Sequence, residues 1–197
     1  MIAGMTKRIE ASLDLYGDYA PSVSVYSICG EVKLLKNILL LLNSKLINWY
    51  FLHKFSDKHL AGGYISINNL MLKQIPFKKV LEENDFALEA NKFRLELQEL
   101  SNKFQRTLER KFELKKLSTK LQEWYLLSYS EFIKELAKKK IKLSLSDESE
   151  WETYFFQESK KAQELKTKIE TTDKAIDTMV YKLYNLTPEE IIIVEGK

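Results

Sequence analysis

Residues 31–55 have the sequence EVKLLKNILLLLNSKLINWYFLHKF, in which large apolar side chains recur at steps of three and four residues. This spacing places them on one face of an α-helix and is typical of a helix that buries that face. The apolar positions are Leu34, Leu35, Ile38, Leu39, Leu42, Leu46, Trp49 and Tyr50. We therefore expect one largely buried helix from Glu31 to about Phe55, with Trp49 and Tyr50 in the core.

The segments on either side of this helix predict short strands. Residues 1–13 contain an extended-looking stretch, and residues 22–28 alternate small polar and apolar side chains, which favours a strand with one buried face. After a polar loop, residues 64–67 predict another strand, and Asn68 is suited to cap a short helix through Leu72. Residues 1–81 are therefore expected to form a small mixed α/β domain.

The remainder of the chain, residues 82–197, predicts helices. Residues 82–113 contain neither Gly nor Pro, and residues 117–136 add one or two shorter amphipathic helices. We expect a loop at residues 144–148, followed by a long helix that starts with a capping box formed by Ser149 and Glu152. Asn185 is expected to end that helix, and Thr187, Pro188 and Glu190 have the residue types that begin another short one.

The last long helix has a heptad pattern, which is typical of a helix that packs along another helix. The pattern consists of Trp151, Phe155, Glu158, Ala162, Leu165, Ile169, Thr172, Ile176, Met179 and Leu183. The helix over residues 82–113 is the expected partner, in an antiparallel hairpin or small bundle with coiled-coil-like packing. The fold class expected for the whole chain is α+β.

Composition and charge point to a folded protein whose front part faces an anion. The chain has 197 residues, of which 45% are hydrophobic and 12% aromatic, so it is not a disordered chain. Residues 1–81 contain ten Lys and Arg against five Asp and Glu, whereas residues 82–197 contain 21 against 23. This excess favours an anionic partner for the front part, with ordinary surface charge as the alternative.

Targeting and redox signals are few. Cys29 is the only cysteine, so it forms no intrachain disulfide, and we expect it to be a small buried side chain. We see no signal peptide, and the most apolar run, residues 38–42, is too short to span a bilayer. The sequence therefore predicts a cytoplasmic protein without a membrane partner.

Several catalytic and metal-binding motifs are missing from the sequence. Gly62 and Gly63 are the only close glycine pair, and no Lys-Ser/Thr follows them as in a phosphate-binding loop. Two histidines and one cysteine disfavour a zinc site of nitrogen and sulfur ligands. The three prolines are not adjacent, which excludes the Asn/Asp-Pro-Pro-aromatic loop of DNA amino-methyltransferases. We therefore expect no catalytic residue and no metal site in this chain.

Three motifs follow one another in the front part of the chain: residues 41–51 (LLNSKLINWYF), 62–68 (GGYISIN) and 74–77 (QIPF). The first resembles the hallmark helix of the TaqI-like C-terminal specificity domains of DNA-modifying enzymes, and the other two follow in that family's order and at similar spacing. Ile75 stands where the family usually has leucine. Residues 150–155, 171–177 (TTDKAID), 180–187 (VYKLYNLT) and 193–195 closely resemble the C-termini of type IIG restriction-modification enzymes.

This resemblance covers nearly the whole chain and implies a non-catalytic C-terminal fragment. It implies a target recognition domain over residues 1–81 and a helical spacer over residues 82–197. The fragment itself would hold no cofactor, while S-adenosylmethionine and Mg²⁺ would belong to the methyltransferase and nuclease domains of the parent enzyme. The implied partners are double-stranded DNA and those N-terminal domains. Type I specificity subunits and phage-defence methyltransferases contain related domains and are alternative parents.

Candidate DNA contacts come from the front part, where lysine and arginine would neutralise phosphates and polar side chains would reach base edges. Arg8 is suited to a bidentate guanine contact or to a surface ion pair, and Tyr64 to a DNA contact or to packing within a strand. The lysines of the polar loop are suited to phosphate contacts or to a solvated loop. The full set is Lys7, Arg8, His53, Lys54, Lys58, His59, Tyr64, Ser66 and Lys73.

Two further possibilities remain open at this point. The Lys138–Lys142 run is either another basic patch or a solvated helix end. The heptad pattern alone is compatible with a helical scaffold or oligomerisation protein, including a homodimer formed through the helices.

Overall fold

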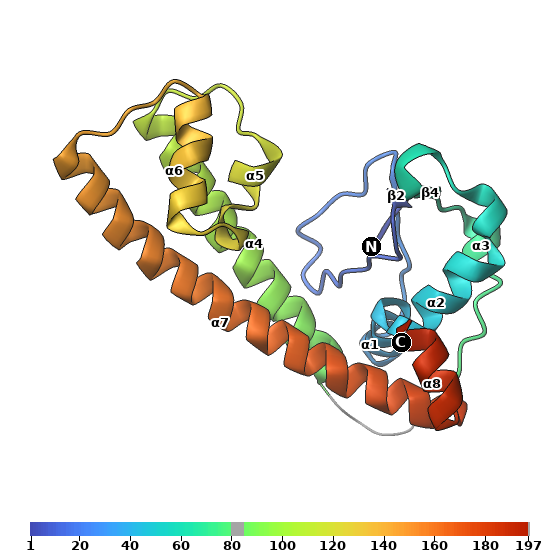
Figure 1. The fold of residues 1–197 in the computed structure, drawn as a ribbon. Helices are drawn as coiled ribbons and strands as arrows, with labels where there is room; N and C mark the ends of the chain where they lie inside the picture. Colours follow the sequence, from blue (N-terminus) through green and yellow to red (C-terminus); the bar gives the residue numbers. More distant parts are fainter. Residues whose placement is uncertain (80–84, 197) are drawn as a thin grey trace. The chain divides into compact units, whose positions relative to one another are not determined.

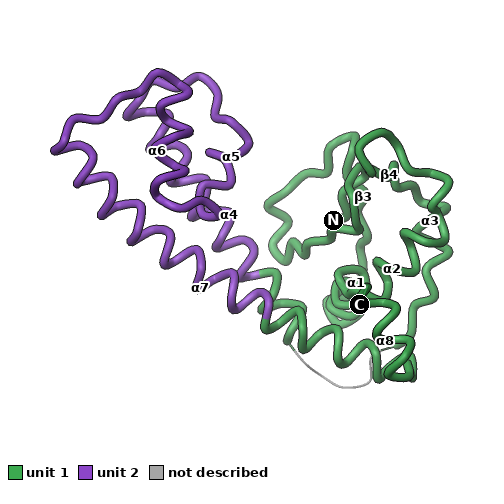
Figure 2. The backbone as a smooth tube through the Cα atoms, viewed as in Figure 1, with its two compact units in different colours: residues 1–91, 171–197 green, residues 92–170 purple. Residues whose placement is uncertain are grey.

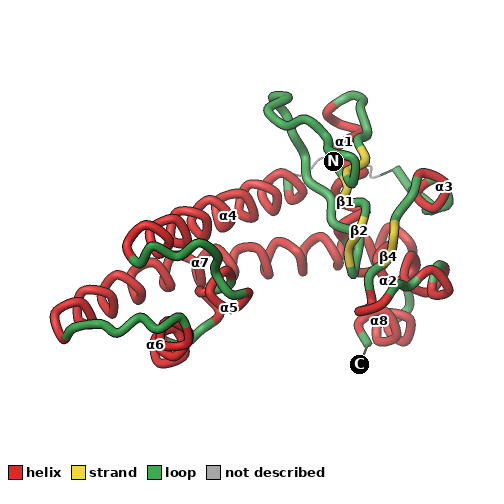
Figure 3. The backbone as a smooth tube through the Cα atoms, turned by 90° about the horizontal axis from the view of Figure 1, so that it is seen from above, coloured by secondary structure: helices red, strands yellow, loops and turns green. Residues whose placement is uncertain are grey.

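The computed structural model describes residues 1–79 and 85–196, which form an α+β protein with two compact units. Unit 1 consists of Met1–Asn91 and Thr171–Lys197, and unit 2 of Lys92–Glu170 (Figure 2). The described strands all lie in unit 1 (Figure 3). The elements, labelled in Figure 1, are β1 (Ile2–Ala3), β2 (Met5–Thr6), β3 (Val25–Tyr26), α1 (Val32–Asn43), α2 (Lys45–Lys54), η1 (Ser56–Lys58), η2 (Ala61–Gly63), β4 (Ile65–Ser66), α3 (Asn69–Leu72), α4 (Phe86–Lys111), α5 (Thr119–Gln122), η3 (Trp124–Leu126), α6 (Tyr129–Lys138), α7 (Leu145–Tyr184) and α8 (Pro188–Glu195).

These units divide the chain at other positions than the sequence-based domains 1–81 and 82–197. The first residues of α4 and the last part of α7, together with α8, belong to unit 1. The reason is packing, because Ala87, Ala90, Ile176 and Val180 share one buried cluster with the leucines of α1. Unit 2 is therefore inserted into unit 1 along the sequence.

The strands of unit 1 form two short antiparallel pairs. β1 pairs with β3, and β2 pairs with β4, with Met5 opposite Ser66 and Thr6 opposite Ile65. Strands were expected within residues 1–13, 22–28 and 64–67, and each observed strand is only two residues long. The Asn68 cap is confirmed, because its side chain accepts a hydrogen bond from the Met71 N–H at the start of α3.

The prediction of a single helix over residues 31–55 is wrong, because Ser44 interrupts the helix and separates α1 from α2. Ser44 adopts an extended conformation (φ −73°, ψ 152°), and its hydroxyl accepts a hydrogen bond from Ile47 N–H and donates one to Leu41 O at 2.7 Å. Serine is a favoured N-cap because its short side chain replaces a missing helical hydrogen bond. The apolar spacing continues across the break and therefore does not reveal it.

Three asparagine side chains hydrogen-bond to one edge of the extended segment 9–13. Asn48 Oδ1 accepts from Ile9 N–H at 2.7 Å, while the Asn43 and Asn91 amides each make two bonds to the backbone of Ala11 and Leu13, respectively. Glu10 and Ser12, which lie between these residues, form hydrogen bonds on the opposite edge of the segment. Glu10 O accepts from Ala3 N–H, and Ser12 N–H donates to Met1 O. The side-chain amides thus take the place of a neighbouring strand and fix this segment against α1, α2 and α4.

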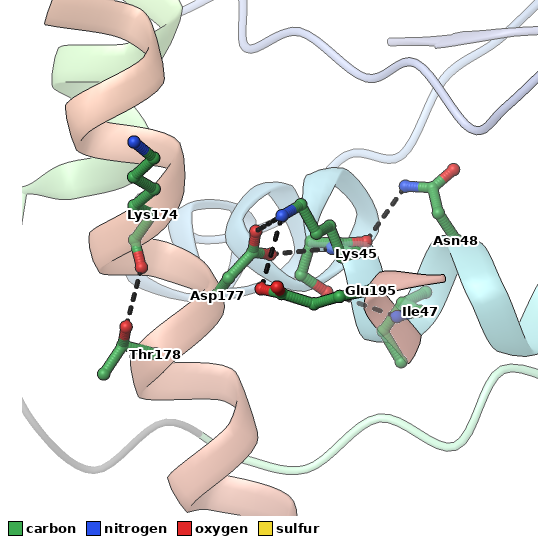
Figure 4. Close-up of polar contacts among 8 residues, drawn as sticks. Lys45, Ile47, Asn48, Lys174, Asp177, Thr178 and Glu195 are labelled. Carbon is green, nitrogen blue, oxygen red and sulfur yellow. Dashed lines mark hydrogen bonds and ion pairs between the residues drawn. The ribbon is translucent and has the colours of Figure 1, made fainter. Parts of the chain in front are cut away.

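The first residue of α2 is held from the far end of the sequence (Figure 4). Asp177 Oδ1 accepts a hydrogen bond from Lys45 N–H at 2.8 Å, and the Lys45 ammonium lies 3.7 Å from Asp177 Oδ2 and 3.4 Å from Glu195 Oε1. Asp177 is buried, and burial raises the pKa of its carboxyl more than the Lys45 contacts lower it. These contacts connect α7 and α8 to the junction at Ser44.

The antiparallel pairing of the two long helices is confirmed within each unit. In unit 2, Phe112 packs on Trp151 and Phe104 packs on Tyr154 and Phe155, while Ala87 and Ala90 meet Ile176 and Val180 in unit 1. All ten heptad positions are buried or half-buried. Helix α7 begins at Leu145, earlier than the expected start at Ser149 and within the expected loop at residues 144–148. Ser144 caps it, because its hydroxyl accepts a hydrogen bond from Asp147 N–H.

The end of α7 and the start of α8 agree with the sequence analysis. Asn185 follows α7 with a positive φ of 58°, and Thr187 and Glu190 form a capping box around Pro188.

Unit 2 is built on an aromatic core. The rings of Phe104 and Trp124 stack with their centres 3.7 Å apart, and Phe132 and Phe155 pack around them.

We predict that Asn48→Asp lowers the free energy of unfolding by about 2 kcal/mol or more at neutral pH. The aspartate would lose the two Asn48 Nδ2 bonds to Leu42 O and Ser44 O and place a charge against these carbonyl oxygens. Urea denaturation measures the change. The control is Asn69→Asp at an exposed position of the same unit, and an equal loss in both variants would contradict the role given to Asn48.

We also predict that Asp177→Asn becomes more stable relative to the wild type as the pH rises. The folded-state pKa of Asp177 lies above its ordinary value of 3.8, so the folded protein binds this proton more tightly than the unfolded chain. The wild type therefore loses stability as the pH rises from that value through the raised pKa, and the amide removes this loss. Denaturation of both proteins across this range is the test, and a constant difference between them would contradict the assignment.

Candidate nucleic-acid interface

The nine candidate residues all lie in unit 1 and are exposed. The pair β2–β4 brings several of them together, because Ser66 lies opposite Met5 and the Lys7 ammonium lies 5.4 Å from the centre of the Tyr64 ring. Tyr64 is 42% exposed, so it is not packed within the sheet. His59 bridges to Ile65, and Leu60 N–H donates to Tyr64 O, which closes residues 59–65 into a compact turn beside this strand pair.

A second group lies at the C-terminal end of α2. The Lys54 ammonium donates a hydrogen bond to the Tyr50 hydroxyl at 2.7 Å, and that hydroxyl donates to Gln74 O at 3.2 Å. This relay places Lys54 near the segment that follows α3, where Lys73 is exposed. His53 stacks on Trp49, with ring centres 4.4 Å apart. Trp49 and Tyr50 are therefore half-buried side chains that reach the surface, which corrects their expected placement in the core.

Two of the candidate cations have acidic partners. Arg8 Nε lies 3.6 Å from Glu10 Oε1, which is the surface ion pair that the sequence left open. Lys58 lies 3.0 Å from Asp57, and its hydrogen bond lowers the pKa of that carboxyl. Exposed pairs of this kind contribute little to stability.

Lys7, Lys54 and Lys73 differ from these two cations, and we call them the front lysines. Over residues 1–79 and 85–196, no carboxylate lies within ion-pair distance of any of the three. Two acids of unit 1, Asp177 and Glu195, instead lie within ion-pair distance of Lys45. In Figure 1, β2 and β4 lie at the end of unit 1 opposite to α8, which supplies Glu195.

Unit 1 as a whole is not basic. It contains 13 Lys and Arg against 14 Asp and Glu, because residues 82–91 and 171–197 add more acids than bases to the basic front part. The excess of the first 81 residues is therefore balanced over the unit as a whole. Its exposed members without a carboxylate partner among the described residues include the front lysines as well as Lys78 and Lys79.

The structure also shows an ordered loop at residues 14–19, where Gly17 and Asp18 predict a turn. The Asp14 carboxylate accepts hydrogen bonds from the backbone N–H groups of residues 16–19 at 2.9–3.3 Å, and these bonds lower its pKa. The loop holds Tyr16 and Tyr19 out in solvent, 86% and 61% exposed. The signal for it is an Asp three residues before a Gly, at Asp14 and Gly17, the pattern of a side chain that caps a turn. Cys29, expected to be buried, is exposed.

Among the residues that the structure describes, no three or more His, Cys, Asp and Glu side chains lie together as a metal site would require. Within the same residues, none of the helices has the length and apolar character needed to cross a bilayer.

Comparison with known proteins places the chain in a family. No curated protein and no solved structure matches it. A family model described as a domain of unknown function, DUF8810, matches residues 78–180, which include all of unit 2 and more than half of the chain. The chain therefore belongs to the DUF8810 family.

Proposed function

We propose that this chain is a non-catalytic DNA-binding module whose unit 1 contacts double-stranded DNA through the front lysines and the polar residues beside them. The observation that carries the proposal is that Lys7, Lys54 and Lys73 are exposed and lack a carboxylate partner among the described residues. Cations in this state are available to replace the counterions of a phosphate backbone.

The groups around these lysines are suited to contact DNA as well. Tyr64 is half-exposed beside Lys7, and the exposed Ser66 and His59 offer hydrogen-bonding groups near the same strand pair. Lysine contacts to phosphates position a protein on the duplex, and hydroxyl and imidazole groups are among those that read base edges. The strand pair, the turn and the end of α2 hold these side chains on ordered backbone.

The resemblance to TaqI-like specificity domains supports a finer proposal. Under this proposal the chain is the C-terminal recognition part of a type IIG restriction-modification enzyme. This part would hold target DNA for an adenine-N6 methyltransferase domain and a nuclease domain on its N-terminal side. Those domains would bind S-adenosylmethionine and Mg²⁺. An Asn-Pro-Pro-Tyr motif encoded directly upstream of Met1 would support this parent, and an unrelated upstream domain would contradict it.

The helical scaffold alternative has less support. A heptad stripe drives association between chains when it is exposed, but here the stripe of α7 is buried or half-buried, and its aromatic positions pack on α4 within the chain. The apolar surface that a second copy would need is thus already covered along this stripe.

We predict that Lys7→Gln with Lys54→Gln weakens the salt dependence of DNA binding. Each lost phosphate contact reduces the slope of log affinity against log salt by about 0.9, so the double variant should lose about 1.8 from the slope. Fluorescence anisotropy of a labelled duplex over a salt series measures both the affinity and the slope.

The matched control is Lys174→Gln with Lys182→Gln, which removes the same charge from exposed positions on α7 in the same unit. The control should keep the wild-type slope. Equal slopes for the wild type and the Lys7 and Lys54 variant, or an equal loss in the control, would rule out the proposed surface.

A further inference from the structure

Unit 2 contains a strongly basic segment that the proposed function does not use. Between Lys103 and Lys142 the chain has twelve Lys and Arg against five Asp and Glu. All twelve basic side chains are exposed. They are Lys103, Arg106, Arg110, Lys111, Lys115, Lys116, Lys120, Lys134, Lys138, Lys139, Lys140 and Lys142.

Two of the five acids in this segment are engaged in structural contacts. Glu135 is buried, accepts hydrogen bonds from Ser118 Oγ at 3.2 Å and from Lys138 Nζ at 2.6 Å, and has a lowered pKa mainly because of Lys138. Glu131 accepts from the backbone N–H and hydroxyl of Ser128 in the capping box of α6. The Ser128 hydrogen bonds, and after them the charges of Lys120 and Lys134, lower the pKa of Glu131. The five acids nevertheless offset fewer than half of the twelve basic charges of the segment.

Most of the basic side chains have no acidic partner. Lys138 pairs with Glu135, and Lys111 lies 3.5 Å from Asp147. For the other ten, the described part of the chain contains no carboxylate within ion-pair distance.

The elements that carry these residues share one core. Lys103, Arg106 and Arg110 follow a helical spacing that puts them on one stripe of α4, whereas Phe104 and Leu108 of the same helix are buried. Lys120 lies on α5 and Lys134 on α6, whose Leu121 and Phe132 join Phe104 in the aromatic core of unit 2. The basic side chains thus stand on helices that pack together within one unit.

Helix stability accounts for only part of this charge. Lysine and arginine stabilise the last turn of a helix, which explains Arg110, Lys111 and Lys138. Lys115 and Lys116 lie in a loop, so neither charge stands in the last turn of a helix. Helix stability therefore does not account for these two lysines.

We propose that unit 2 binds the phosphate backbone of DNA through this basic segment, as a second contact surface separate from the front lysines. The identity of the polyanion rests on the proposed function, but the surface itself does not depend on unit 1. Because lysine and arginine recognise phosphates without reading bases, the contact adds affinity without sequence preference.

The experiment uses two double variants of the full chain. The first carries both Lys115→Gln and Lys116→Gln; the control carries both Lys160→Gln and Lys166→Gln, on α7. Both pairs remove the same charge from unit 2, and Lys160 and Lys166 lie outside the basic segment. A labelled duplex is titrated over a salt series, with a second duplex of scrambled sequence and phosphatidylserine vesicles as separate arms. Circular dichroism and thermal unfolding show whether each variant is folded.

The expected result is a slope lowered by about 1.8 for the Lys115 and Lys116 variant, equally on both duplexes, with the control unchanged. The wild-type slope in that variant, an equal loss in the control, absence of DNA binding by the wild type, or preference for the vesicles would overturn the proposal. The two surfaces are distinguishable, because a loss in the Lys7 and Lys54 variant alone supports only unit 1, and a loss in the Lys115 and Lys116 variant alone supports only unit 2.

Discussion

The hydrogen bonds from Asn43, Asn48 and Asn91 to the extended segment 9–13 are the interaction on which unit 1 depends. An extended segment exposes backbone groups on both edges, and leaving buried groups unpaired is costly. Here Met1 and Ala3 satisfy one edge, and three amides satisfy the other at every second residue. Because the amides come from α1, α2 and α4, one set of bonds fixes three helices against the extended segment that follows β2 and Lys7.

The break at Ser44 connects the start of α2 to the C-terminal part of the chain. It creates a new helix start, and the Lys45 N–H at that start is satisfied by Asp177 from α7. Residues 171–197 are therefore part of the unit that carries the front lysines, while unit 2 carries a basic segment of its own. Under our proposals each unit supplies phosphate contacts, and in unit 1 the C-terminal segment supports the junction that begins α2.

Local signals were sufficient to predict some of this structure. Asn68, Asn185 and Thr187 end or begin helices through bonds to residues close in sequence, and the heptad pattern predicted the pairing of α4 with α7. The break at Ser44 was missed because apolar spacing is the same on both sides of it. The unit boundary was missed because it depends on contacts such as Lys45 to Asp177, which join distant parts of the sequence. At the site, exposure of the lysines was predictable, and the pairing of Arg8 with Glu10 had a usable signal, since residues two apart on an extended segment share a face.

The insertion of unit 2 into unit 1 has a consequence for synthesis on the ribosome. Residues 92–170 are contiguous, so unit 2 has all of its own packing partners as soon as that stretch has emerged. Unit 1 cannot complete its core at that stage. The buried leucines of α1 and the backbone N–H of Lys45 are synthesised long before their partners Ile176, Val180 and Asp177. The portion of the polypeptide that is translated first is thus the last to complete its core, and during that interval its apolar helix is open to chaperones or to misassembly.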